Sequence, residues 1–182
     1  MLFRSCKKAS GGSAISNFPK RTREGEGILQ KLVCETLSGK EPICDLFCGI
    51  GTFALPLSLT HAVHAADGTA SHIAALSAAA KAQRAPVTTE VRDLFRRPLT
   101  GPELKRFGAV VLDPPRPGAS SQARALAVSD VPRIVYISCN PASFSRDARL
   151  LADGGYRLER VVPLDQFLWS AHVELFSVFR KT

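Results

Sequence analysis

Cys139 stands where an α/β protein would carry a reactive side chain. It lies in Ser138-Cys139-Asn140-Pro141, directly after the apolar run 134–137. That run predicts a buried strand followed by a turn, so the thiol is expected at the carboxyl end of a strand, where open α/β sheets bind ligands. Because thiolates are strong nucleophiles, Cys139 is the predicted nucleophile of an active site. The alternative is a buried, inert thiol, which is common for cysteine.

A glycine-rich turn, Asp-Leu-Phe-Cys-Gly-Ile-Gly-Thr, follows another predicted strand and opens a helix. Gly49 and Gly51 let the backbone approach a ligand closely, and the helix start presents free N–H groups. Ala54 occupies the third glycine position of the dinucleotide fingerprint, so this motif alone is a weak signal. Asp67, after the second strand, is predicted to bind ribose hydroxyls, and Asp93, after the third, an adenine amino group. Each aspartate could instead be a helix cap or turn residue.

Asp113 opens the segment Asp-Pro-Pro-Arg-Pro-Gly after the fourth predicted strand. Successive prolines fix the backbone and remove N–H donors, so this loop is expected to be stiff and to aim the Asp113 carboxylate at a bound ligand. Arg116 in the same loop is predicted either to hold a phosphate or to be an ordinary surface arginine.

Helical and strand-like segments alternate from residue 24 onward, which predicts a doubly wound α/β sheet whose strands are mostly parallel. The last two strand-like segments have no helix between them, so they are expected to form an antiparallel C-terminal pair of a seven-stranded sheet. The expected helices are 27–37, 52–59, 71–82, 121–127 and 143–152, and the expected strands are 42–47, 61–66, 87–91, 109–112, 134–137, 156–164 and 172–180.

The net charge of +8 is unevenly distributed. Residues 1–23 form a Gly/Ser-rich leading segment with six basic side chains and no acidic one, and residues 24–182 carry the remaining eighteen basic and sixteen acidic side chains. The folded domain is therefore expected over 24–182 with only a small positive charge. The leading segment is predicted to be a solvated linker or a phosphate-binding tail.

Composition excludes several classes of protein. No apolar stretch approaches the roughly 18 residues of a membrane helix, and no secretory signal is recognisable at the amino terminus. The five cysteines are odd in number and lack Cys-x-x-Cys spacing. We therefore expect a reduced, cytoplasmic protein with no disulfide framework, no metal site and no membrane partner.

Four segments together resemble the RNA uracil-5-methyltransferases over residues 15–182: DLFCGIGTFALPLS, VVLDPPRPGA, VYISCNPASFSRDARLL and DQFLWSAHVELFSVFRK. That family uses S-adenosylmethionine to make 5-methyluridine in structured RNA, either tRNA or rRNA. The resemblance implies a Rossmann-like class I methyltransferase fold and makes 24–182 a catalytic domain. It also implies a cofactor pocket lined by Phe47, Thr52, Asp67, Asp93 and Asp113.

The resemblance also implies a covalent mechanism. The Cys139 thiolate would add to carbon 6 of uracil and turn carbon 5 into an enolate carbon that attacks the methyl group. Glu174, in His172-Val173-Glu174, matches the base that then removes the carbon 5 proton, and apolar neighbours are expected to raise its pKa. Glu174 could instead be an edge-strand charge that discourages aggregation. His172 is expected to be structural or substrate-orienting.

Two departures from the family pattern bear on function. Members carry a Phe-x-Gln element whose glutamine contacts the cofactor, whereas Lys20 follows Phe18-Pro19 here. Many members also have an N-terminal RNA-binding barrel and a central domain, some with an iron–sulfur cluster. We therefore expect a catalytic domain alone, with RNA binding completed by a separate domain or protein.

Two other functions stay open. One is a methyltransferase for another substrate, although such enzymes do not need a cysteine after the fifth strand together with a late His-Val-Glu. The other is a remnant that binds cofactor or RNA without efficient turnover, which Lys20 and the weakly charged domain favour. Phosphate contacts dominate RNA affinity, so a domain of small net charge is expected to bind RNA poorly by itself.

Overall fold

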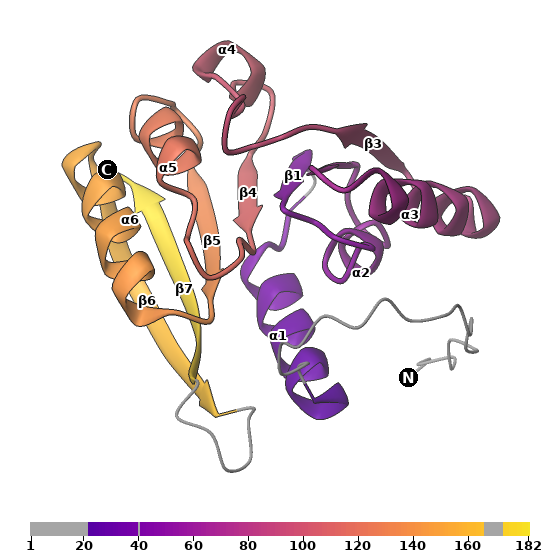
Figure 1. The fold of residues 1–182 in the computed structure, drawn as a ribbon, viewed down its shortest axis with the longest axis horizontal. Helices are drawn as coiled ribbons and strands as arrows, with labels where there is room; N and C mark the ends of the chain where they lie inside the picture. Colours follow the sequence, from indigo (N-terminus) through magenta and orange to yellow (C-terminus); the bar gives the residue numbers. More distant parts are fainter. Residues whose placement is uncertain (1–21, 40, 166–172) are drawn as a thin grey trace.

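Seven strands form one sheet with helices on both faces (Figure 1). The computed structural model describes residues 22–39, 41–165 and 173–182. The strands are β1 (Ile43–Leu46), β2 (Val63–Asp67), β3 (Val87–Val91), β4 (Ala109–Leu112), β5 (Arg133–Ser138), β6 (Tyr156–Asp165) and β7 (Val173–Lys181). The helices are α1 (Arg23–Thr36), α2 (Ala54–Leu57), α3 (Ala70–Gln83), α4 (Gly101–Leu104), α5 (Ser120–Ala127) and α6 (Pro141–Asp153).

The strand order is β3-β2-β1-β4-β5-β7-β6. Strands β1 to β5 pair in parallel, whereas β7 lies between β5 and β6 and is antiparallel to both. The predicted fold is therefore confirmed, including the antiparallel C-terminal pair. The chain order reverses between β1 and β4, which is the switch point where open α/β sheets bind ligands beyond the strands' carboxyl ends.

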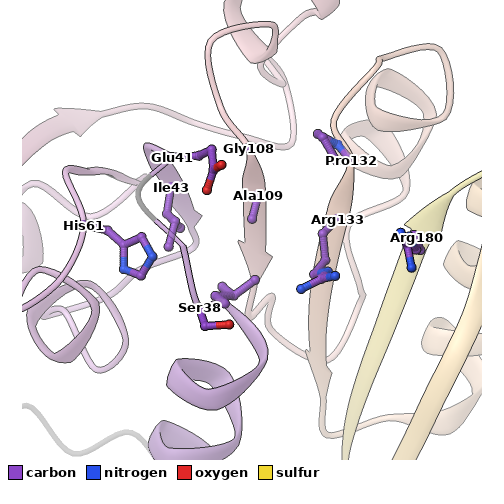
Figure 2. Close-up of a pocket in the computed structure, with 10 residues that line it drawn as sticks. Ser38, Glu41, Ile43, His61, Gly108, Ala109, Pro132, Arg133 and Arg180 are labelled. Carbon is purple, nitrogen blue, oxygen red and sulfur yellow. The ribbon is translucent and has the colours of Figure 1, made fainter.

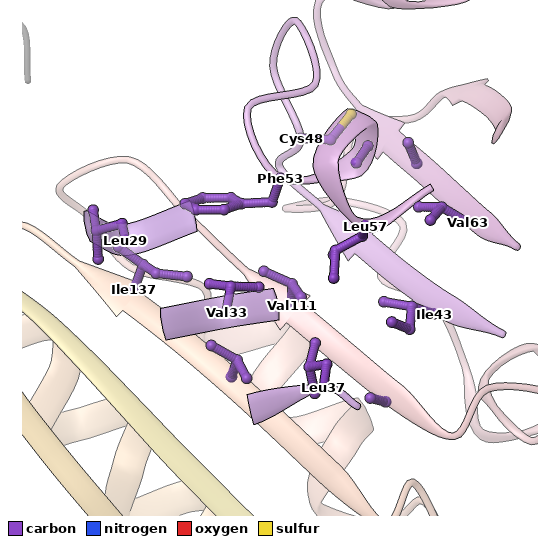
Figure 3. Packing of buried hydrophobic residues seen from close by; sticks show 14 of the residues in the cluster. Leu29, Val33, Leu37, Ile43, Cys48, Phe53, Leu57, Val63, Val111 and Ile137 are labelled. Carbon is purple, nitrogen blue, oxygen red and sulfur yellow. The ribbon is translucent and has the colours of Figure 1, made fainter. Parts of the chain in front are cut away.

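The first face of the sheet is covered by α1, α2 and α3. Leu29, Val33 and Leu37 recur every four residues along α1 and its cap, and all three are buried. They pack in one cluster with Val111 of β4 and Ile137 of β5 (Figure 3). This spacing places them on a single stripe of the helix, which is why the segment folds as an amphipathic helix.

The opposite face carries a second core beneath α4, α5 and α6. Leu126 of α5 and Leu151 of α6 join Ile134 and Tyr136 of β5 in this cluster, and all are buried. Because Val135 and Ile137 point to the first core, β5 is buried on both faces. This explains why its residues 134–137 form a continuous apolar run in the sequence. In Figure 1, α5 and α6 accordingly lie on the other side of β5 from α1.

Three helices differ most from the sequence expectation, while α3, α5 and α6 differ by one or two residues at their ends. Helix α1 begins at Arg23, before the predicted start at residue 27, because the Thr22 hydroxyl accepts a hydrogen bond from the Gly25 N–H (3.1 Å). Helix α2 is a single turn instead of extending to residue 59, and the Ser58 hydroxyl donates to the Leu55 carbonyl just after its end (2.6 Å). Helix α4 was not predicted, although Thr100 and Glu103 form a capping box at its start.

Several sequence expectations concern residues outside the described part of the chain. These are most of the leading segment 1–23, Lys20 and His172. Arg23, the last residue of that segment, belongs to α1. Within the described ranges, no helix is long and apolar enough to cross a membrane.

Candidate active site

A cleft of about 370 Å³ opens at the carboxyl ends of β1 to β4. Five of the seven predicted cofactor residues line it, and they come from four different strand ends. These five are Phe47, Gly49, Asp67, Asp93 and Asp113. The convergence follows from the parallel topology, because the carboxyl ends of parallel strands meet at the same edge of a sheet.

Asp67 is held in the cleft by backbone donors. The Gly49 N–H donates to Asp67 Oδ2 (3.1 Å), and the Thr69 N–H donates to Oδ1 (2.7 Å). Gly49 has φ of +54°, a conformation that L residues rarely adopt, so the glycine is needed to present this N–H. The Asp67 side chain is 13% exposed and thus still accessible to hydroxyl groups of a ligand.

Two aromatic rings form one wall of the cleft. Phe47 has φ of +61°, which is strained for a bulky residue and which is found mainly at functional positions. Its ring lies 5.3 Å, centroid to centroid, from that of Phe95. Asp93 Oδ1 accepts hydrogen bonds from the N–H groups of Phe95 (3.0 Å) and Arg96 (3.2 Å), so Asp93 also shapes the turn that presents Phe95. Sequence reasoning missed Phe95, whose only signal is its position two residues after Asp93.

The two remaining predicted cofactor residues do not line the cleft. Gly51 has φ of +96°, and a side chain there would collide with Leu76 of α3, so this glycine serves helix–loop packing. The Thr52 carbonyl accepts a hydrogen bond from the Gln30 side-chain amide (3.0 Å). This bond ties the glycine-rich turn to α1.

Asp45, at the end of β1, is fully buried and lacks a hydrogen-bond partner for either carboxylate oxygen in the described part of the chain. Burial raises the pKa of Asp45 well above its usual value, and the charges of Asp113 and Asp67 raise it further. The nearby backbone N–H of Ala54 lowers the Asp45 pKa and so offsets part of this rise. The contact does not meet the distance and angle of a normal hydrogen bond. The protonated, uncharged form of Asp45 is therefore favoured, and the charged carboxyl groups that line the cleft itself are those of Asp67, Asp93 and Asp113.

Cys139 and Glu174 are brought together by the antiparallel pairing of β5 and β7. Ser138 pairs with Leu175 at the end of the ladder. Because the strands are antiparallel, the next residue of one chain segment, Cys139, lies opposite the preceding residue of the other, Glu174. Burial raises the pKa of the half-buried Cys139 thiol above its ordinary value, the Glu174 charge raises it further, and the Arg116 charge opposes both. Glu174 is 2% exposed. The Asp113 charge also raises the thiol pKa, so the Arg116 charge and the backbone N–H of Cys139 are the two groups that favour the thiolate.

The loop that carries Asp113 and Arg116 is tied to the Cys139 turn through Asn140. Asn140 caps α6 by accepting the Ala142 N–H at Oδ1 (3.1 Å), and its side-chain amide donates to the Arg116 carbonyl (3.1 Å). One side chain therefore orders both the turn after Cys139 and the proline-rich loop.

A buried carboxylate, Asp147 of α6, provides a second anchor for the proline-rich loop. Its Oδ2 accepts the Ala119 N–H (2.6 Å) and the Tyr136 hydroxyl (2.7 Å), while its Oδ1 pairs with Arg146 (2.8 Å). Arg146 also donates to the Pro117 carbonyl (2.8 Å). The Ala119 N–H at the end of the loop and the Pro117 carbonyl within it are therefore both bonded to side chains of α6, one to Asp147 and the other to Arg146.

The other described cysteines, whose thiols could also react, lie in structural positions. Cys44 and Cys48 are buried, and burial raises the pKa of both thiols, which makes them inert core residues. Cys34 is half-buried on α1. The four cysteines of the described ranges are unpaired, and no group of three or more potential metal ligands occurs there.

Comparison with known proteins identifies the family. Residues 28–181 match the family model described as tRNA (Uracil-5-)-methyltransferase. The chain belongs to the tRNA (uracil-5-)-methyltransferase family. The resemblance drawn from the four sequence segments is thus confirmed.

Relatives in this family are longer than the chain. An uncharacterized RNA methyltransferase of Brucella suis biovar 1 is 49% identical over 166 residues, which cover 90% of this chain and 40% of that protein. The 23S rRNA (uracil(1939)-C(5))-methyltransferase RlmD of Pseudomonas fluorescens is 38% identical over 161 residues, covering 84% of this chain and 36% of RlmD. The chain thus spans about two fifths of the length of these curated relatives.

Solved structures agree with the family and the fold. The tRNA (uracil-54, C5)-methyltransferase of Pyrococcus abyssi, solved with S-adenosyl-L-homocysteine, aligns with a TM-score of 0.75 and 30% identity, covering 85% of this chain and 38% of that one. TYW2 of M. jannaschii, solved with AdoMet, aligns with a TM-score of 0.66 at 16% identity, covering 88% of this chain and 78% of TYW2. The second match supports the class I methyltransferase fold alone.

The environment of Cys139 predicts how its reactivity responds to charge. Replacing Glu174 with glutamine is expected to lower the pKa of the thiol because a like charge is removed, and Arg116→Gln is expected to raise it because a cation is removed. The rate of iodoacetamide alkylation at the Cys139 peptide, followed by mass spectrometry across pH, measures both shifts. Shifts of the same sign in the two variants would contradict this arrangement of charges.

The anchored loop predicts that Gly118 cannot be replaced. Gly118 has φ of +79°, and a Cβ there would lie 2.5 Å from Asp147 Oδ2. A left-handed L residue costs about 1–2 kcal/mol, and displacement of Asp147 adds to this, so Gly118→Ala is expected to lower the free energy of unfolding by about 2 kcal/mol or more.

Gly27→Ala is the matched control for Gly118→Ala. Gly27 lies within α1, and no heavy atom would be within 4 Å of an added Cβ. Alanine there is expected to raise the free energy of unfolding by about 0.5–1 kcal/mol. Urea denaturation of both variants tests the pair, and equal stability changes would refute the assigned role of Gly118.

Proposed function

We propose that the chain transfers a methyl group from S-adenosylmethionine to carbon 5 of uridine in structured RNA, through a covalent bond between Cys139 and the base. The observation that carries this proposal is the pairing of a half-buried thiol with a buried carboxylate at the ends of β5 and β7. The family and the RNA methyltransferases among its relatives support RNA as the substrate class. Both tRNA and rRNA enzymes occur among those relatives, and the proposed location is the cytoplasm.

The cleft at the ends of β1 to β4 fits the proposed cofactor. Asp67, fixed by two backbone donors, has lone pairs left for ribose hydroxyls, and the Phe47 and Phe95 rings offer apolar surface for an adenine. The carboxyl groups of Asp67, Asp93 and Asp113, which line the cleft, suit a ligand with ammonium and sulfonium charges. When bound, S-adenosylmethionine supplies the electrophilic methyl group that uracil carbon 5 attacks.

Cys139 performs the first part of the proposed reaction. Its sulfur bonds to uracil carbon 6, and the electrons of the carbon 5–carbon 6 double bond move toward carbon 5 and oxygen 4. The raised pKa favours the protonated thiol at rest, so its proton must pass to solvent as the sulfur bonds to carbon 6, which leaves the Glu174 carboxylate available for the later step. Arg116 is the nearby cation that can stabilise the resulting negative charge.

Glu174 performs the last part. Once carbon 5 carries both a methyl group and a hydrogen, the Glu174 carboxylate removes the proton, the double bond reforms, and the bond between carbon 6 and sulfur breaks. A positioned general base of this kind contributes about 10²–10⁴-fold to a rate. Because Glu174 lies one residue beyond the last β5–β7 pair, the sheet itself sets its position relative to Cys139.

An RNA containing 5-fluorouridine tests the proposed chemistry. Fluorine on carbon 5 cannot be removed as a proton, so incubation with S-adenosylmethionine is expected to leave the protein covalently bound to the RNA. Intact-mass spectrometry measures this adduct. Cys139→Ala should abolish it, whereas the matched variant Cys34→Ala should retain it, because Cys34 lies on α1 away from the cleft.

Two outcomes of this experiment would count against the proposal. An adduct that survives Cys139→Ala would reject the assigned nucleophile. A protein that binds S-adenosylmethionine but forms no adduct would favour the alternative, a cofactor-binding or RNA-binding remnant without efficient turnover.

A further inference from the structure

Three arginines lie side by side on the last three strands of the sheet. Arg133 of β5 pairs directly with Arg180 of β7, which in turn pairs with Arg157 of β6. Directly paired residues in antiparallel strands point to the same face, so all three side chains share one face. Figure 2 shows Arg133 and Arg180 on neighbouring strands beside a cavity of about 270 Å³.

This face also carries the catalytic pair. Side chains two apart along a strand share a face, so Arg133 lies on the same face as Cys139, and Arg180 on the same face as Glu174. Arg160 of β6 pairs with Val178 and therefore joins them. We call Arg133, Arg157, Arg160 and Arg180 the arginine row.

Like charges placed opposite each other destabilise a sheet, so stability alone does not account for the arginine row. Glu159, a carboxylate of β6, forms ion pairs with this row, at 3.1 Å from Arg157 and 3.8 Å from Arg180. The arginine row and Glu159 therefore carry a net charge of about +3. Glu41 also borders the cavity in Figure 2, but beside Gly108 at its β1–β4 side.

The guanidinium groups of the row are available to a partner in different degrees. The side chains of Arg157 and Arg180 are 68% and 59% exposed. The Arg160 guanidinium lies over the Phe176 ring, 5.9 Å from its centroid. Arg133 instead donates to the Thr36 carbonyl at the end of α1 (2.8 Å), which gives it a structural role. The accessible charge is thus concentrated on β6 and β7.

We propose that the arginine row binds the phosphate backbone of the RNA whose uridine enters the catalytic site. This inference rests on the proposed function. Arginine matches phosphate through paired, charge-assisted hydrogen bonds. At 3.3–3.4 Å per residue, Val178 lies about 13 Å and Arg180 about 20 Å along β7 from Glu174. A stacked strand carries one phosphate per about 3.4 Å, so it spans this distance in about four to six nucleotides.

Protection of an exposed sheet edge is the competing explanation for Arg157 and Arg160. Strand β6 is the last strand of the sheet, and charged side chains on edge strands discourage pairing with another chain. That explanation does not require the arginines to lie on the catalytic face, nor does it involve Arg180 on the interior strand β7. The two explanations differ in what removal of the charges should change.

The test is the affinity of the full chain for a fluorescein-labelled RNA hairpin with uridines in its loop, measured by fluorescence polarisation across salt concentration. Arg157→Gln/Arg160→Gln is expected to weaken binding about tenfold near physiological salt and to lower the salt slope by about 1.4, given about 0.7 per lost contact to a single strand. The matched control is Arg124→Gln/Arg149→Gln. It removes the same charge from α5 and α6 on the opposite face and should leave affinity and slope nearly unchanged.

Three outcomes would overturn the inference. These are equal losses in both double variants, a β6 variant that aggregates without losing RNA affinity, and a wild-type chain that does not bind the hairpin. The proposed function is tested separately, because adduct formation with 5-fluorouridine RNA depends on Cys139. A chain that binds RNA through the arginine row but forms no adduct would keep this inference while rejecting the methylation chemistry.

Discussion

The insertion of β7 between β5 and β6 is the constraint on which the site depends. The hydrogen-bond register of the antiparallel β5–β7 pair sets Glu174 opposite Cys139, although the two residues are 35 positions apart in the sequence. Because the side-chain period of a strand is two, a shift of one residue would turn Glu174 to the other face. Both faces of β5 are buried, so the two hydrophobic cores oppose such a slip.

Buried charge is the second organising feature, and it serves two purposes. Asp147 is satisfied by donors from β5, α6 and the proline-rich loop, so it fixes the position of Asp113 and Arg116 relative to Cys139. Asp45 accepts no hydrogen bond of normal geometry from the residues that the structure describes, and the charges of Asp113 and Asp67 add to the rise in its pKa that burial causes. The first arrangement satisfies a buried carboxylate with hydrogen-bond donors, whereas the second favours the protonated, uncharged form of Asp45.

Sequence reasoning predicted features that depend on local pattern. Helix α3, strands β3 and β4, and the glycine-rich turn follow from spacing and turn chemistry, and the convergence of Asp67, Asp93 and Asp113 follows from the parallel topology. The place of β7 within the sheet and the contact of Phe95 with Phe47 could not be predicted, because they depend on tertiary packing. The buried role of Asp147 could not be predicted either, because nothing in the sequence distinguishes it from an exposed aspartate on a helix. The raised pKa of Cys139 arises from burial, which also depends on tertiary packing.

The central claim is that Cys139 and Glu174 act at successive steps on the same uracil. Its most direct test is incubation of Glu174→Gln with S-adenosylmethionine and an ordinary uridine-containing RNA, followed by intact-mass spectrometry. We expect a covalent protein–RNA adduct that carries the methyl group, because the carbon 5 proton can no longer be removed, while the matched variant Glu159→Gln on β6 turns over without an adduct. Full turnover by Glu174→Gln with no adduct would contradict the account.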